Sequence, residues 1–187
     1  MTYFKTPYKY GIKTKAQIDA ISTSQLEIGD NVFNSDIGKE EFWTGNTWLN
    51  DDCVEMTNTQ GATVNVGNLV CVNSLITSSP TGSIKFSDTT VANEDRTIGV
   101  IYRGGANNAK VVVAGMGLYP VKVTTATTAS GVTRQFIVTT SATAGEAAST
   151  GAKTGGTGAF GVITKTYAAN AITGQLINCW INSAESF

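Results

Sequence analysis

The stretch NVFNSDIGKEEFWTGNTWLN, at residues 31–50, sets large apolar side chains among turn-forming residues. Ser-Asp-Ile-Gly at 35–38 and Gly-Asn at 45–46 are suited to tight turns between strands. The large apolar residues come as adjacent pairs, and successive residues of a strand point to opposite faces. The sequence therefore predicts a small meander with large apolar groups on both faces and with strands at about 31–34, 40–44 and 47–50.

A meander of this size cannot bury two apolar faces by itself, so we expect other layers or other copies of the chain to cover it. Its aromatic residues Phe42, Trp43 and Trp48 could instead stack on sugar rings or on bases. We favour packing, because aromatic residues lie on both faces. Glu40 and Glu41 are adjacent on a strand, so their carboxylates face opposite ways and do not form a catalytic pair.

Residues 1–28 predict an anchoring arm that ends in a short helix. Aromatic and basic residues mix over residues 1–13, where Pro7 and Gly11 discourage regular structure. The segment TKAQ at 14–17 fits a helix capping box. The positive charge of the arm is small and local, so docking on a partner protein is favoured over binding to nucleic acid. The residues that we expect to contact partners or other copies are Tyr3, Phe4, Tyr8, Tyr10, Phe33, Phe42, Trp43 and Trp48.

From residue 54 onward the chain reads as strand after strand, separated by turn residues. No amphipathic helical pattern follows residue 22. We therefore predict an all-β fold made of the arm, an aromatic β-meander over 29–53, and a sandwich-like or barrel-like β domain over 54–187. The expected strands of this domain lie at 64–66, 69–72, 98–102, 111–113, 119–123, 136–138, 160–163 and 175–181.

A faint internal echo divides the β domain. TIGVIY at 97–102 resembles AFGVIT at 159–164, and each follows a long polar stretch and precedes a loop and further strand residues. The echo predicts two related halves, 54–123 and 124–187. Residues 139–159 are almost free of large side chains, which predicts a long surface loop or a segment that orders against a partner.

The chain has 187 residues, a formal charge of −1 and 14% charged residues. Near-zero net charge predicts no general attraction to nucleic acid or to an anionic membrane. No apolar run reaches the ~18 residues of a membrane-spanning helix, and the first residues lack the apolar stretch of a secretory signal. We therefore expect the chain to fold in a cytoplasm.

The sequence holds no histidine, which excludes a Ser-His-Asp triad, a Cys-His dyad and a His-ligated metal. Cys53, Cys71 and Cys179 are scattered, and we expect buried, reduced thiols. GTGAFG at 156–161 matches G-x-G-x-x-G, but it follows a loop and precedes a strand-like run, which is not the context of a dinucleotide site. The acidic clusters lack the alternate spacing of a calcium loop. We therefore expect no enzyme, no cofactor and no metal.

One segment resembles a module of tailed bacteriophages. GDNVFNSDIGKEEFWTGNTWLN at 29–50 resembles a short module of phage fibre and decoration proteins, in which G-D-x-V-[FY]-[ND]-[ST] leads by a turn to W-x-G-x-x-W. Downstream, VNVGNLVCV at 64–72 and the segment 95–117 resemble the β domain of capsid decoration and head-fibre proteins. The sequence departs from that pattern at Asn68, where Asp is usual, and at Ile101, where the residue is often small.

The resemblance covers roughly residues 29–117 and implies a structural protein of the virion, similar to head-fibre proteins of crassvirus-like phages. It implies a homotrimer that is assembled in the host cytoplasm and anchored by its N-terminal arm on the capsid or on other virion proteins. The alternative is a host-recognition module of a tail fibre, which would bind a surface glycan through an exposed aromatic platform.

Overall fold

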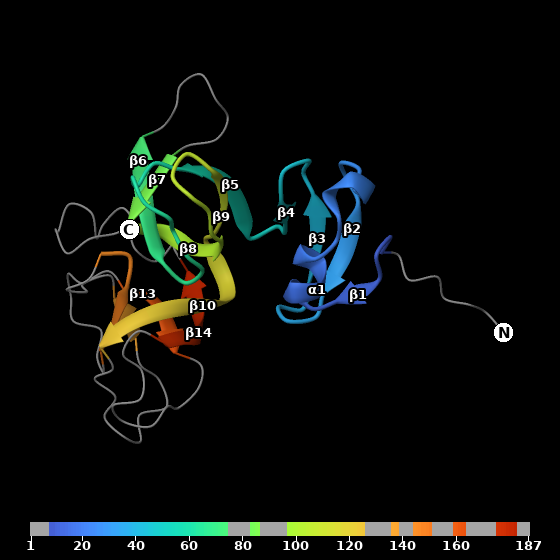
Figure 1. The fold of residues 1–187 in the computed structure, drawn as a ribbon. Helices are drawn as coiled ribbons and strands as arrows, with labels where there is room; N and C mark the ends of the chain where they lie inside the picture. Colours follow the sequence, from blue (N-terminus) through green and yellow to red (C-terminus); the bar gives the residue numbers. More distant parts are fainter. Residues whose placement is uncertain are drawn as a thin grey trace. The chain divides into compact units, whose positions relative to one another are not determined.

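The computed structural model describes residues 8–74, 83–86, 97–125, 136–138, 144–150, 159–163 and 175–182. Strands dominate these residues, so the all-β prediction is confirmed. The chain divides into two compact units, Met1–Asp51 and Asp52–Phe187 (Figure 1). The expected arm and the meander therefore belong to one unit, of which residues 1–7, with Tyr3 and Phe4, lie outside the described residues.

The first unit is a sheet of four strands in the order β1-β2-β3-β4. The strands β2, β3 and β4 pair antiparallel and confirm the predicted meander. The strand β1 was not predicted. It pairs parallel with β2 and directly follows Gly11, whose φ is +70°. The elements are β1 (Ile12–Lys13), α1 (Lys15–Asp19), the 3-10 turn η1 (Thr23–Gln25), β2 (Asn31–Asn34), β3 (Lys39–Trp43) and β4 (Trp48–Leu49).

The capping box predicted at 14–17 is present at the start of α1. The Thr14 side chain accepts from the Gln17 N–H, and the Gln17 side chain accepts from the Thr14 N–H. This short helix places Ile18, which is fully buried, against one face of the sheet. The core of the unit is made of Ile18, Val32, Trp43 and Trp48, with Tyr10, Ile21 and Leu26 packed against it.

The second unit holds two small closed barrels of five strands each. The first barrel closes in the order β5-β7-β6-β8-β9 and is made of β5 (Cys53–Asn58), β6 (Leu69–Ser74), β7 (Ser83–Phe86), β8 (Thr97–Arg103) and β9 (Lys110–Ala114). The second closes in the order β10-β12-β11-β13-β14 and is made of β10 (Met116–Thr125), β11 (Phe136–Val138), β12 (Ala147–Thr150), β13 (Ala159–Ile163) and β14 (Gln175–Asn182). The barrel alternative of the prediction is therefore the observed one.

The two barrels have the same topology. In each, the first and third strands pair parallel and every other neighbouring pair is antiparallel. The echoing segments 97–102 and 159–164 contain most of β8 and all of β13, which are the fourth strands of their barrels. The predicted boundary between the halves is misplaced, because 119–123 lies in β10 of the second barrel and Gly115 alone separates β9 from β10.

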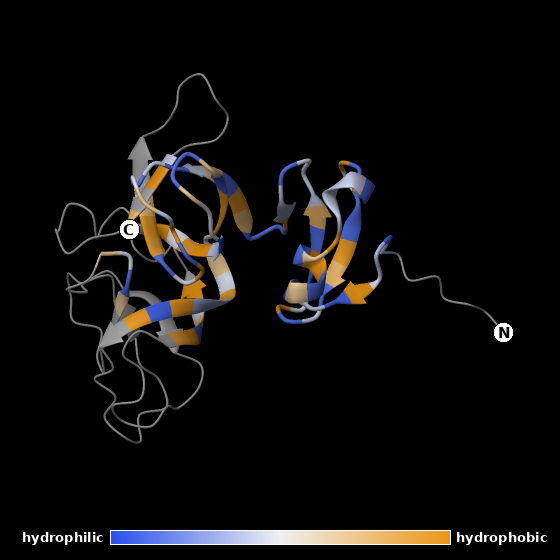
Figure 2. Ribbon diagram, in the orientation of Figure 1, coloured by the Kyte–Doolittle hydropathy of each residue, from blue (hydrophilic) through white to orange (hydrophobic). Residues whose placement is uncertain are grey.

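In the second unit three strands escaped prediction, and one predicted strand is absent. The strands β5, β7 and β12 have few large apolar residues, and β12 lies inside the expected loop at 139–159. The predicted strand at 64–66 is an isolated bridge between Val64 and Gly105. Figure 2 colours the strands by hydropathy. In β10 apolar and polar residues alternate over Val121, Lys122 and Val123, and such alternation is a signal by which strands are found.

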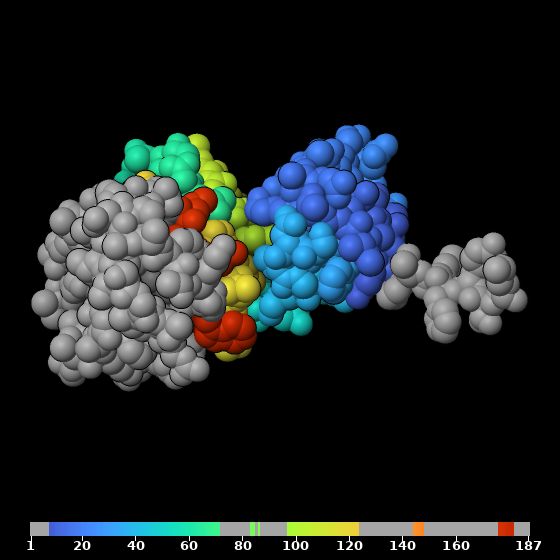
Figure 3. Space-filling model, turned by 90° about the horizontal axis from the view of Figure 1, so that it is seen from below, coloured from blue at the N-terminus to red at the C-terminus, as the bar shows by residue number. Residues whose placement is uncertain are grey.

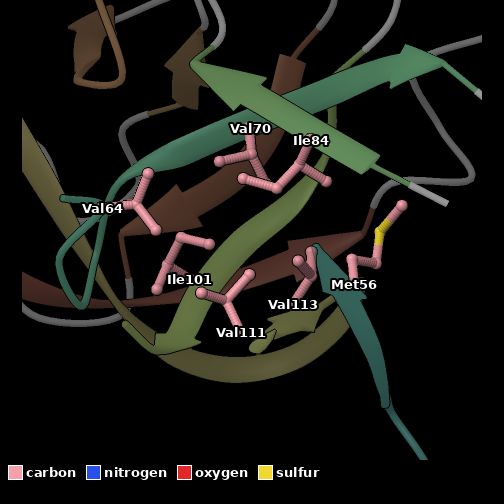
Figure 4. Close-up of a cluster of buried hydrophobic side chains, with 7 residues drawn as sticks. All are labelled: Met56, Val64, Val70, Ile84, Ile101, Val111 and Val113. Carbon is pink, nitrogen blue, oxygen red and sulfur yellow. The ribbon is translucent and has the colours of Figure 1, made fainter. Parts of the chain in front are cut away.

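Aliphatic valine, isoleucine and methionine side chains fill the first barrel. They come from every strand of the barrel and from the bridge at Val64 (Figure 4). Ile101, at the position where the resemblance favours a small residue, is fully buried among them. The cluster is Met56, Val64, Val70, Ile84, Ile101, Val111 and Val113.

The turn at 65–68 joins the two barrels. The Gly67 carbonyl accepts from the Lys122 N–H of β10 at 2.8 Å, and the Leu69 N–H donates to the Gly145 carbonyl, also at 2.8 Å. The Asn68 side chain donates from Nδ2 to the same Gly145 carbonyl at 3.1 Å. An aspartate at Asn68, as the resemblance would favour, could not donate there unless protonated, so the departure has a physical reason in this chain.

Candidate interaction surfaces

The two tryptophans predicted to contact other copies lie in the core of the first unit. Trp43 and Trp48 are 8% and 3% exposed, and their ring centroids are 5.6 Å apart. The helix α1 and the Tyr10 ring cover them, so the stretch at 31–50 builds a miniature core on this face. Their assignment as contact residues is corrected, because a side chain sealed in its own unit offers no surface to a neighbour.

Tyr8 and Tyr10 are part of the folded unit and not of a free arm. The Tyr8 ring lies 5.5 Å from that of Phe33, and the Tyr10 hydroxyl donates to the Gln25 carbonyl at 2.8 Å. The segment is also held by Lys9, whose Nζ lies 2.7 Å from Oδ1 of Asp30. The described part of the predicted arm is thereby fixed to the loop before β2.

Asp30 is the acidic centre of this attachment. It is 7% exposed and accepts from the Glu27 N–H at 2.9 Å. That backbone hydrogen bond, followed by the bond from Lys9, lowers the pKa of the Asp30 carboxyl. The bond to Asp30 in turn raises the pKa of Lys9. Each partner therefore stabilises the charged form of the other.

Phe33 and Phe42 lie on the opposite face of the same sheet. The strand register places Ile12 beside Phe33, and Phe42 beside Leu49, on one side. Ile12 is 63% exposed and Phe42 is 39% exposed. We call this the outer sheet face and define it by Ile12, Phe33, Phe42 and Leu49. The prediction of apolar groups on both faces is confirmed, and among the described residues Ile12 and Phe42 remain exposed on this face while Tyr8 packs on Phe33.

A second apolar surface lies on the second barrel and was not predicted. Along β10 and β14 the odd-numbered residues from 117 to 123 and from 177 to 181 are buried, and the even-numbered ones point outward. The register sets Leu118 opposite Trp180 and Lys122 opposite Leu176. Figure 3 shows atoms of β10, in yellow, and of β14, in red, at the molecular surface. We call this the β10/β14 face and define it by Met116, Leu118, Pro120, Lys122, Leu176, Asn178 and Trp180.

Large apolar side chains on this face are about half exposed. The exposed fractions are 52% for Met116, 40% for Leu118, 52% for Leu176 and 53% for Trp180. The sequence carried the signal, since QLINCWIN at 175–182 has apolar residues on both of its faces, as the meander does. Adjacent exposed apolar side chains of this size are typical of a surface that binds another molecule.

The β10/β14 face is electrically neutral. Its one charged residue is Lys122, whose Nζ lies 2.6 Å from Oε1 of the largely buried Glu146. Asn178 supplies an amide, and the remaining members of the face are apolar. A surface of this kind favours a partner that is itself apolar over one that is strongly charged.

The acidic residues and cysteines behave as ordinary parts of the fold. Glu40 and Glu41 lie on opposite faces of β3 as predicted, with Glu41 fully buried. Cys71 and Cys179 are buried as predicted, whereas Cys53 is partly exposed. Burial raises the pKa of the Cys179 thiol, which disfavours its reactive thiolate form. No group of three or more Cys, Asp or Glu side chains gathers among the described residues in a way that could hold a metal.

Strand β13 begins within the segment 156–161, as the strand-like residues that follow the motif had predicted.

In the described ranges, no helix has the length and apolar character needed to cross a membrane. No protein-family model matches the chain, and no curated protein matches it.

Proposed function

We propose that this chain is a structural protein of a tailed-bacteriophage virion, which decorates the capsid or forms a head fibre. It associates with copies of itself, as a homotrimer, and with capsid or other virion proteins. Its chemistry is the burial of apolar side chains between folded β surfaces. The observation that carries this proposal is the uncovered row of large apolar residues on the β10/β14 face.

Two further features support the proposal. The outer sheet face of the first unit is a separate apolar surface, so the chain has one such surface in each unit. The segments that resemble phage fibre and decoration proteins include β2 to β4 and β8 to β9, which are regular strands in both units. Burying a Trp or Leu side chain contributes about 1.5–3 kcal/mol, so several half-exposed side chains suffice for a stable contact.

Labelling of intact particles tests this role. An antibody raised against the full chain is applied to purified virions of a phage that encodes it, and the particles are viewed by electron microscopy. We expect regular labelling of the head. Unlabelled particles, together with the absence of the chain from a protein digest of the virion, would reject the structural role.

A second candidate function is glycan recognition on a tail fibre. Trp180 favours it, because an exposed indole next to the amide of Asn178 can stack on a sugar ring and hydrogen-bond its hydroxyls. A glycan array with the full chain, compared with Trp180→Ala, tests it. Binding that disappears in the variant, with the label found at the tail tip, would establish this function in place of the first.

A further inference from the structure

The two barrels differ in how the outer side of their last strand is covered. In the first barrel, Val112 and Ala114 of β9 alternate with core residues and point outward, as do Val100 and Tyr102 of β8. All four are between 0% and 2% exposed. At Tyr102 the second barrel supplies the cover, since the Tyr102 ring lies 5.3 Å from the Tyr119 ring of β10.

The equivalent strand of the second barrel is β14, because both barrels have the same strand order and directions. Its outward residues Leu176 and Trp180 are 52% and 53% exposed. The outward side of the last strand is therefore buried in the first barrel and open in the second. Among the described residues, nothing covers Leu176 and Trp180 to the extent that Val112 is covered.

We propose that the β10/β14 face is buried against the same face of further copies of this chain. This inference rests on the proposed function and names the surface through which the copies associate. Two copies meet about a two-fold axis, or three copies bring the face together around a three-fold axis. About a two-fold axis the residues of the face meet the same residues of the other copy, whereas around a three-fold axis only the residues nearest the axis do so.

Charge and composition favour the β10/β14 face of another copy as the surface that covers this face. The Lys122 charge is balanced within the chain by Glu146, so copies do not repel one another when the faces meet. Among the residues of the second unit whose exposure the structure describes, Val54 is the one exposed large apolar residue outside this face. A different surface of the unit therefore offers no comparable apolar match among those residues. Two β-sheets that stack face to face lie ~10 Å apart, and Trp and Leu side chains are large enough to fill the space between them.

Solution mass is the first test. Light scattering of the full chain over a ~100-fold range of concentration is expected to give masses above the 19.6 kDa of one chain. Trp180→Ser and Leu118→Ser each raise the dissociation constant by ~30-fold or more, as central aromatic and aliphatic contacts do. Val54→Ser is the matched control, since it removes an exposed apolar residue of the same unit and leaves the mass unchanged.

Cross-linking is the second test and does not depend on the folding of those variants. In a Cys53→Ser background, Asn178→Cys places a thiol at the centre of the face, and mild oxidation is expected to join copies through it. Ala106→Cys, on an exposed turn of the first barrel, is the control and stays uncoupled. Assemblies that persist in both serine variants, without cross-links through residue 178, overturn the inference and leave the virion role standing. A wild-type chain that is monomeric at every concentration overturns this inference and self-association together.

Discussion

The two barrels share strand order and direction, yet the outward residues of the last strand are buried in the first barrel and exposed in the second. Val112 on β9 is fully buried, whereas Trp180 on β14 is 53% exposed. Topology therefore specifies where a barrel can be covered, and the surrounding chain decides whether it is. The two barrels contact each other through Tyr102, Tyr119 and the turn at 65–68. Variants of these residues test this contact.

The largest effect is expected at the tyrosine pair. Tyr102 and Tyr119 are 2% and 1% exposed, and each ring packs on the other. Tyr102→Ala is expected to lower the free energy of unfolding by about 3–5 kcal/mol, because it leaves a cavity between the barrels. Urea unfolding of the single variants and of the Tyr102→Ala/Tyr119→Ala double variant measures the coupling. Strictly additive losses would mean that the rings do not stabilise each other.

Gly67→Ala is expected to have the next largest effect. Gly67 has φ +88°, and a Cβ there would lie 2.2 Å from Cδ2 of Leu176 and 3.0 Å from the Lys122 nitrogen. We expect a loss of about 2–4 kcal/mol from backbone strain and overpacking. Gly61→Ala is the matched control, since Gly61 has φ +83° and nothing within 4 Å of the added Cβ. If thermal unfolding shows that both variants lose the same stability, the close contact of Gly67 with the second barrel does not contribute to the effect.

Asn68→Asp is expected to cost about 1–3 kcal/mol at neutral pH, because a carboxylate would face the Gly145 carbonyl that the amide now donates to. Protonation restores the donor, so the pKa of the new carboxyl is raised in the folded state. The variant is therefore closest to wild type at low pH and loses stability as the pH rises through that pKa. Asn65→Asp, at an exposed position of the same turn, is the control. A deficit in Asn68→Asp that is the same at pH 4 and pH 7 would contradict this reasoning.

The smallest effect is expected outside the barrels, at Asp30 of the first unit. Its pKa is lowered in the folded state, so its contribution is present above the ordinary carboxyl pKa and is lost as the pH falls through the folded value. In Trp180→Phe, the remaining tryptophans, Trp43 and Trp48, report the first unit by fluorescence. Asp30→Asn in that background is expected to flatten the fall of the melting temperature below about pH 4. An unchanged acid profile would show that Asp30 contributes nothing.

Local signals predicted much of this fold. The turns at 35–38 and 45–46 define the meander, and the capping box at 14–17 defines the helix, because neighbouring residues determine both. The echo of 97–102 in 159–164 falls in β8 and β13, which are the fourth strands of their barrels and have a similar sequence pattern. These elements depend on a few adjacent side chains, which a sequence displays directly.

Long-range pairing could not be predicted in the same way. The strands β7 and β12 are short, and each completes its barrel by pairing parallel with a strand that is distant in sequence. Trp43 and Trp48 were misassigned because alternation shows that a sheet has two apolar faces but not which face the chain itself covers. The same alternation in β14 pointed to Trp180, and its exposure could be recognised only once the barrels were placed side by side.

Gly115 has a mechanical consequence. It is the single residue between the last strand of one barrel and the first strand of the next, and its N–H donates to the Asp52 carbonyl at 3.0 Å. With no slack coil between β9 and β10, a pull on either strand reaches the other directly along the backbone. Tension applied across the two barrels therefore loads their strand hydrogen bonds without first extending a linker between β9 and β10.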